Sequence, residues 1–107
     1  QHREGAEMTI VGDGSQRRDF TYIDDVVTAN ICAMKSSTEQ IPHKIYNVGT
    51  GTNYSIWEVA DMIGHNKNYI PARLAEVKET LADIEDTIND LGWQPKHDLR
   101  DKINEYW

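Results

Sequence analysis

The chain has 107 residues, the length of a single domain, and its hydrophobic residues (38%) include enough aromatics for one modest core. Its net charge of −7 argues against nucleic acid and anionic membranes as partners, because both require a cationic face. The single cysteine excludes an intramolecular disulfide and a cysteine-rich zinc site, and no apolar run reaches the roughly 20 residues of a membrane span. We therefore expect a cytoplasmic protein with no nucleic-acid or membrane partner.

The N-terminal part of the chain predicts two short strands and one helix. Residues 8–11 are a run of β-prone side chains that ends at a glycine turn, and residues 19–23 alternate polar and apolar side chains. A helix is expected to begin at Asp24 and Asp25, because negative charge favours a helix start, and to fade near residues 36–38. Its apolar residues recur at helical spacing and are expected to face inward: Ile23, Val27, Ile31 and Met34.

The rest of the chain predicts a strand followed by helices. Residues 44–48 have the strongest strand pattern in the chain, and glycines end it. Ser55 followed by Glu58 is a capping box, so a helix is expected to start there. The remaining expected elements are an extended piece over residues 67–71 and two helices, capped by Asp83 and by Asp98. This order predicts an α/β fold with a few short strands and about four helices.

Most patterns that would indicate a catalytic or metal site are missing. The four histidines lack metal-ligand spacing, and no tyrosine is followed four residues later by lysine. Glycine pairs at 12–14 and 49–51 follow strands but do not complete G-x-G-x-x-G, so turn glycines are the favoured interpretation. Arg17 and Arg18 are more informative, because a guanidinium donates two parallel hydrogen bonds to a phosphate. Pairing with a nearby carboxylate is the alternative.

Four segments, in order, carry a resemblance to a known family: residues 10–26, 46–51, 71–76 and 81–96. Together they resemble the C-terminal part of extended short-chain dehydrogenases, the NAD-dependent nucleotide-sugar epimerases and dehydratases that include the UDP-glucose 4-epimerases. The resemblance covers nearly the whole chain. It implies a single nucleotide-sugar-binding lobe over residues 1–107, without the family's N-terminal NAD-binding domain. It implies no cofactor in this chain, NAD being the cofactor of the parent family.

The resemblance also implies a binding site for a UDP-sugar or a related nucleotide-sugar. By position in the family motifs, Arg18 and Arg73 would clamp the diphosphate. Glu76 would hold the ribose hydroxyls, and the backbone of Thr9 and Val11 would line the base. No catalytic, cofactor-binding or metal-binding residue is implied.

The chain departs from the family pattern at two places. Ala75 stands where the family usually has glycine, which restricts the loop if this position needs a positive φ. The segment over residues 64–71 is several residues shorter than expected, and this bears on the position of Arg73.

Three interpretations of function remain open. The chain is the substrate-binding part of a UDP-glucose 4-epimerase-like enzyme, the same lobe of a dTDP-sugar 4,6-dehydratase or another nucleotide-sugar enzyme, or a truncated fragment with a structural or self-association role. The chain alone is not expected to be an enzyme, because the family's catalytic tyrosine and lysine and its NAD-binding residues are missing. A strand edge and apolar side chains left uncovered in such a lobe predict a homo-oligomer.

Overall fold

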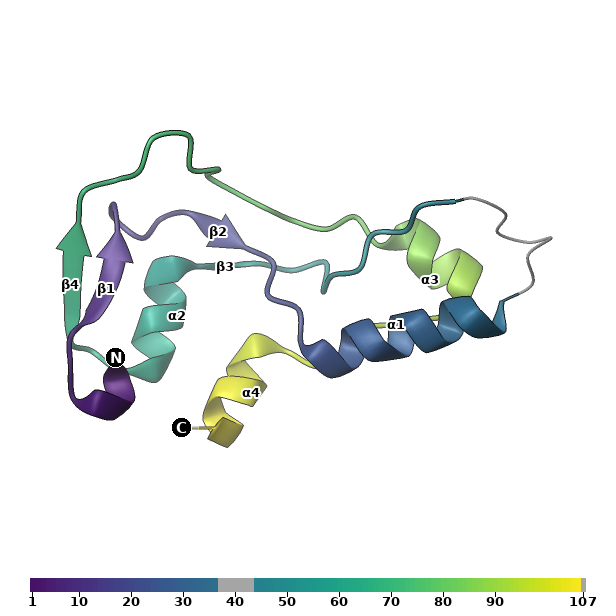
Figure 1. Ribbon diagram of the computed structural model, residues 1–107, viewed down its shortest axis with the longest axis horizontal. Helices are drawn as coiled ribbons and strands as arrows, with labels where there is room; N and C mark the ends of the chain where they lie inside the picture. The colour runs from purple at the N-terminus through teal and green to yellow at the C-terminus, as the bar shows by residue number, and fades with distance from the viewer. Residues whose placement is uncertain (37–43, 107) are drawn as a thin grey trace.

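The computed structural model describes residues 1–36 and 44–106, which form an elongated α/β arrangement (Figure 1). In chain order the elements are η1 (His2–Glu4), β1 (Met8–Val11), β2 (Arg17–Arg18), α1 (Ile23–Lys35), β3 (Tyr54–Ser55), α2 (Ile56–Ile63), β4 (Lys67–Ile70), α3 (Glu85–Leu91) and α4 (Leu99–Tyr106). The Cα radius of gyration is 16.9 Å, whereas a compact domain of this length has about 13 Å. The expected α/β lobe with short strands and about four helices is confirmed.

At one end of the molecule, β1 and β4 form a parallel pair (Figure 1). The register runs from Met8 opposite Lys67 to Val11 opposite Ile70. Alternate β1 side chains point into a small core with α2, as the period of a strand requires. This core contains Met8, Ile10 and Ala60, with Ile56 and Ile63 packed against them. The strand expected at residues 8–11 and the extended piece near residue 67 are both confirmed.

The helix α2 starts at the predicted capping box. The Ser55 hydroxyl accepts a hydrogen bond from the Glu58 amide at 3.0 Å, and the Glu58 carboxylate accepts one from the Ser55 amide at 2.7 Å. Each side chain therefore satisfies a backbone N–H that the first helical turn leaves unpaired. The helix ends before Gly64, as expected.

At the other end of the molecule, the C-terminal segment is joined to α1 by the Asp25–Trp93 cluster, which comprises Asp25, Thr28, Trp93, Lys96 and His97. The Trp93 ring is 2% exposed, and its Nε1 donates to the Asp25 carbonyl and the Thr28 hydroxyl, both at 3.0 Å. The Asp25 carboxylate accepts hydrogen bonds from the Lys96 and His97 amides, each at 3.1 Å. It also lies 2.8 Å from Nδ1 of His97. The sequence did not predict this buried cluster.

The strand expected at residues 19–23 is wrong. Strand pairing occurs just before it, where β2 pairs antiparallel with β3. Residues 19–22 form no strand because the Asp19 side chain fixes this part of the chain. Its carboxylate accepts hydrogen bonds from the amides of Thr50, Gly51 and Ala82.

The strand expected at residues 44–48 is also wrong. This segment is extended but pairs with no strand of the described residues, and Ile45 is 92% exposed. Lys44 and Tyr46 instead contact the Asp90 carboxylate at 2.7 and 2.8 Å. A run of β-prone side chains does not make a strand by itself, because a strand also needs a neighbour to pair with.

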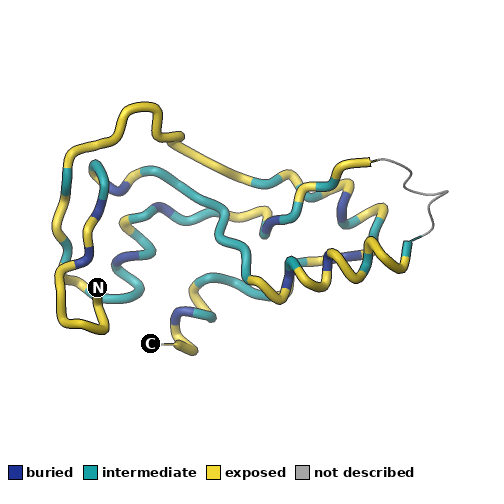
Figure 2. The backbone as a smooth tube through the Cα atoms, viewed as in Figure 1, coloured by how far each residue is buried: buried dark blue, intermediate teal, exposed yellow. Residues whose placement is uncertain are grey.

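The helix α1 forms over nearly the predicted range, but its large apolar residues are exposed rather than turned inward (Figure 2). The helix turns Asp25 and Ala29 toward the Asp25–Trp93 cluster, so the opposite side meets solvent. The expected end near residues 36–38 agrees at Ser36, and the two following residues lie outside the described ones. The exposed fractions are 64% for Ile23, 47% for Val27, 43% for Ile31 and 83% for Met34.

Candidate functional site

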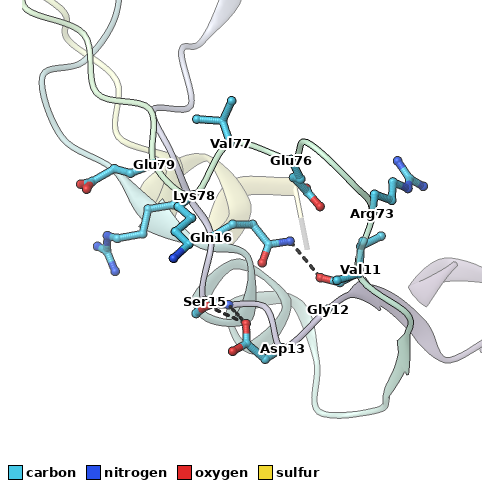
Figure 3. Close-up of a pocket in the computed structure, with 12 residues that line it drawn as sticks. Val11, Gly12, Asp13, Ser15, Gln16, Arg73, Glu76, Val77, Lys78 and Glu79 are labelled. Carbon is cyan, nitrogen blue, oxygen red and sulfur yellow. Dashed lines mark hydrogen bonds between the residues drawn. The ribbon is translucent and has the colours of Figure 1, made fainter.

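A hollow of about 670 Å³ lies between the turn that follows β1 and the segment that follows β4 (Figure 3). One wall is formed by residues within 11–17, and the other by residues within 72–79, which we call the 72–79 wall. In Figure 1 this second segment belongs to the long arch that runs from β4 to α3. The hollow is therefore built from segments that are far apart in the sequence.

The first wall turns sharply at two glycines. Gly12 and Gly14 have φ values of 71° and 77°, in the left-handed region. A Cβ added at Gly14 would lie 3.1 Å from both Ile10 and Trp57 side-chain atoms, so this position also needs a small residue. The interpretation of these residues as turn glycines is confirmed.

Asp13 is held by this same turn. Its carboxylate accepts hydrogen bonds from the Ser15 hydroxyl at 2.6 Å and the Ser15 amide at 2.9 Å. These bonds lower the pKa of Asp13 below its ordinary value. Asp13 is therefore an ionised residue at the rim, oriented by its own turn.

The strand β1 has one free edge beside the hollow. The Met8 amide donates a hydrogen bond to the carbonyl of Asn66, just before β4, and the Gly12 amide donates one to the carbonyl of Ile70 in β4, each at 2.9 Å. In a parallel pair, alternate residues bond to the same neighbour. Thr9 and Val11 therefore direct their backbone groups to the opposite edge.

Two side-chain carboxamides bind the backbone at this free edge. The Thr9 amide donates to Oε1 of Gln1 at 2.9 Å, and Nε2 of Gln16 donates to the Val11 carbonyl at 3.0 Å (Figure 3). Val11 lines the hollow, whereas Thr9 lies further along β1 and lines a separate depression. The edge thus offers a donor and an acceptor that planar amide groups already satisfy.

Arg18 and Glu76 face each other beside the hollow. Nη2 of Arg18 lies 3.7 Å from Oε1 of Glu76, with side chains 24% and 33% exposed. Glu76 lines the hollow, and Arg18 stands just outside the lining. Arg18 also donates from Nη1 to the Arg17 carbonyl at 2.7 Å.

Arg73 lines the same hollow, but its side chain is not engaged there. It makes no hydrogen bond or ion pair within residues 1–36 and 44–106. Figure 3 shows its guanidinium directed away from Gln16 and Ser15. The Arg73 guanidinium is therefore without a partner in the described part of the chain and points away from the opposite wall.

Ala75, which stands where the family usually has glycine, adopts a left-handed backbone conformation. Its φ is 62°, and it is the one non-glycine residue with a positive φ among those that the structure describes. An L-residue with a Cβ pays about 1–2 kcal/mol in this region, whereas glycine does not. The 72–79 wall therefore carries local backbone strain.

Comparison with known proteins gives a consistent result. The model of the NAD dependent epimerase/dehydratase family matches residues 1–49. UDP-glucose 4-epimerase of Corynebacterium glutamicum is 33% identical over 102 residues, which are 89% of this chain and 31% of that protein. UDP-glucuronate 4-epimerase of Thermodesulfobacterium geofontis is 32% identical over 107 residues, 94% of this chain and 32% of that protein.

A solved structure shares both the fold and the sequence pattern. UDP-glucuronic acid 4-epimerase of Bacillus cereus, in complex with UDP-glucuronic acid and NAD, has a TM-score of 0.88 and 32% identity. The match covers 97% of this chain and 35% of that one. The chain belongs to the NAD dependent epimerase/dehydratase family. It spans about a third of the length of the relatives it matches.

Family membership confirms the resemblance inferred from the four sequence segments. The structure brings Val11, Arg73 and Glu76 to one hollow, places Arg18 at its rim, and leaves Thr9 outside the lining. The roles that the family motifs suggest for these residues stay predictions.

Sequence reasoning missed several residues of the hollow. Gln16 lies between the glycine turn and the arginine pair, so its position in the motif was a usable signal. Lys78 and Glu79 line the second wall, where local sequence gives no sign that they approach Arg17. Within residues 1–36 and 44–106, no group of three potential metal ligands converges. None of the helices in these ranges has the length and apolar character needed to cross a membrane.

Proposed function

We propose that this chain binds the nucleoside diphosphate part of a UDP-sugar, as the substrate-binding part of a nucleotide-sugar epimerase. The observation that carries the proposal is the hollow between β1 and the 72–79 wall, with Arg73 unengaged in its lining and the Arg18–Glu76 pair at its rim. Its volume lies within the roughly 300–1,000 Å³ of small-molecule sites. A cationic pair suits a diphosphate in an otherwise acidic chain.

The free edge of β1 is where the base would bind. A uracil imide presents a donor flanked by acceptors, as a carboxamide presents a donor beside an acceptor. Gln1 and Gln16 already bond to the Thr9 amide and the Val11 carbonyl with such groups. A base at this edge would replace those contacts. Thymine has the same imide edge, so a dTDP-sugar is the alternative ligand.

The diphosphate and ribose would separate the Arg18–Glu76 pair. At 3.7 Å this contact is a long ion pair, so each group can be transferred to a ligand at modest cost. Arg18 and Arg73 would donate charge-assisted hydrogen bonds to phosphate oxygens, and Glu76 would accept from ribose hydroxyls. Bonds of this kind contribute about 1.5–3 kcal/mol each.

NAD supplies hydride-transfer chemistry in enzymes that bind it. The residues of this chain do not fit that cofactor, because neither glycine pair completes the dinucleotide-binding pattern. We therefore assign no step of NAD chemistry to this chain.

Calorimetric titration with UDP, dTDP, ADP and uridine tests the proposal. We expect UDP to bind more tightly than uridine, and Arg18→Ala to weaken UDP binding about tenfold or more. Lys35→Ala, at the far end of α1, is the matched control and should leave the affinity unchanged. Equal binding of uridine and UDP would show that the two arginines do not clamp the diphosphate.

The exposed apolar side of α1 favours a second role in self-association. We propose that Ile23, Val27, Ile31 and Met34 pack against a second copy of the chain, since their exposed row would otherwise remain in water. Light scattering at micromolar concentration should give a dimer mass that the double substitution Val27→Glu, Ile31→Glu reduces to a monomer. A wild-type mass of 12.3 kDa at every concentration would contradict this role.

A further inference from the structure

Arg17, the neighbour of the motif arginine, has its whole guanidinium engaged by the protein. Nε donates to Oδ1 of Asn53 at 2.9 Å, and Nη2 donates to the Asn53 carbonyl at 3.0 Å. Nη1 lies 3.3 Å from Oε2 of Glu58, the capping residue of α2. Although Arg17 lines the hollow, its three nitrogens are directed to the start of α2 rather than offered to a ligand.

The backbone of Arg17 holds the 72–79 wall. Its amide donates to the Lys78 carbonyl at 2.8 Å, and its carbonyl accepts from the Thr80 amide at 3.0 Å. Asn53 completes the connection, since Nδ2 donates to the Glu79 carboxylate at 2.9 Å and to the Thr80 carbonyl at 3.1 Å. One arginine and one asparagine thus join β2, the start of α2 and the wall.

The same carbonyl of Arg17 also orients Arg18. Nη1 of Arg18 donates to it at 2.7 Å, which places Nη2 beside Glu76. The position of the Arg17 peptide therefore determines both the wall and the direction of the rim arginine.

We call the hydrogen bonds of Arg17 and Asn53 to the wall the clamp. They matter because apolar packing contributes little to holding the wall in place. Residues 71–80 are all exposed, and Leu74 is 100% exposed. A segment with few buried contacts opens locally at low free-energy cost unless hydrogen bonds restrain it. The Arg17–Asn53 contacts supply that restraint at the C-terminal end of the wall.

We propose that Arg17, acting with Asn53, is a positioning residue that fixes the 72–79 wall and the Arg18 guanidinium without touching the ligand. The proposal rests on the proposed function for the identity of the ligand. Its structural part, the ordering of the wall, stands without any ligand and can be tested separately.

Amide hydrogen exchange of the ligand-free chain tests the ordering of the wall. We expect Arg17→Met and Asn53→Ala to raise exchange within residues 73–82 about tenfold, with α1 and α4 unchanged. Tyr54→Phe is the matched control. Tyr54 follows Asn53 in the chain, and its hydroxyl donates a 2.6 Å hydrogen bond to Asp98 but none to the wall among the described residues. If Arg17→Met leaves exchange in 73–82 at the wild-type rate, the proposal is overturned, whether or not UDP binds.

UDP titration of the same variants separates positioning from direct contact. Asn53 does not line the hollow, so a roughly fivefold weaker affinity in Asn53→Ala would report the wall alone. The double variant should be no weaker than the worse single variant, because both residues serve one clamp. Arg17→Lys keeps the charge but not the planar fork, and we expect it not to restore affinity.

Two outcomes of the titration would reject one of the proposals. Wild-type affinity in Arg17→Lys, combined with loss in Arg17→Met and no loss in Asn53→Ala, would identify Arg17 as a direct phosphate ligand and reject the positioning role. No UDP binding by the wild-type chain would reject the proposed function, and hydrogen exchange would still decide the role of Arg17.

Discussion

The Asp25–Trp93 cluster and the 72–79 wall both join parts of the chain that are distant in sequence, but they do so by different means. In the cluster, Asp25 and Trp93 are 1% and 2% exposed, and every polar group described above has a partner. The wall is exposed throughout and depends on hydrogen bonds to Arg17 and Asn53 at its end (Figure 2).

The difference shows how a small chain divides stability and recognition. Buried, fully bonded groups are costly to disturb, so the cluster fixes the fold at one end of the molecule. An exposed wall that opens easily can admit a ligand but contributes little to folding. The variants that follow test this division, from the largest expected change to the smallest.

Asp25→Ala should have the largest effect on stability. It leaves the Lys96 and His97 amides without their acceptor and removes the charge beside the His97 ring. Each amide left without its acceptor in this buried site costs about 1–3 kcal/mol, so we expect a loss of about 3 kcal/mol in all. Urea denaturation measures the change, and Asp24→Ala, the exposed neighbour, should cost less than about 1 kcal/mol. Similar free energies of unfolding for the Asp25→Ala and Asp24→Ala variants would show that the buried cluster is not the main source of stability.

Asp19→Ala should have an intermediate effect on stability. Its carboxylate connects the Thr50–Gly51 turn to Ala82, at the C-terminal end of the arch. Because these amides are only partly buried and water can replace the acceptor, we expect a loss of about 2 kcal/mol in urea denaturation. Asp13→Ala, whose carboxylate bonds to its own turn, should leave stability close to that of the wild type.

Acid should weaken the cluster through Asp25. Burial acts to raise the pKa of Asp25, but hydrogen bonds from Lys96 and His97 outweigh it and lower the pKa below its ordinary value. A lowered pKa in the folded state gives stability that is present above about pH 3.9 and is lost as the pH falls below it.

The acid effect is measured as a difference between two proteins. Between about pH 5 and pH 3, the wild-type chain should lose more stability than Asp25→Asn, which has no carboxyl to protonate there. Parallel pH profiles for the two proteins would show that Asp25 is not the titrating group.

Ala75→Gly should have the smallest effect and the opposite sign. Glycine relieves the positive φ of 62° at this position but adds freedom to the unfolded chain. The net expectation is a gain of about 0.5 kcal/mol, measured by thermal unfolding. Ala72→Gly is the matched control and should lower stability, because Ala72 has no positive φ to relieve.

Local patterns in the sequence predicted much of the fold but few of the long-range contacts. The Ser55 capping box and the β1 strand depend on residues close in the chain, and the structure has both. The strand expected at residues 44–48 depends on a distant partner, and the described residues contain none. The apolar side of α1 likewise needs a distant partner to cover it, so its helical spacing alone did not predict that it is exposed.

The candidate site shows the same limit. Motifs identified Arg18, Arg73 and Glu76 as a group, and the structure places them around one hollow. They did not indicate Asn53 or the engagement of Arg17, because those contacts join residues whose separation in sequence carries no periodic signal. Pattern reasoning thus found residues that lie around the hollow and missed those that bond to the wall.

The parallel pairing of β1 with β4 also sets the order in which the molecule can assemble. Met8 lies opposite Lys67, so closing this loop costs about 3–4 kcal/mol of chain entropy before any contact is gained. Contacts between such distant residues form late in folding. A nascent chain that has not yet reached Ala72 lacks the 72–79 wall, and one that has not reached Thr80 lacks a hydrogen bond that holds it, so the hollow is completed only after α2 and β4 are synthesised.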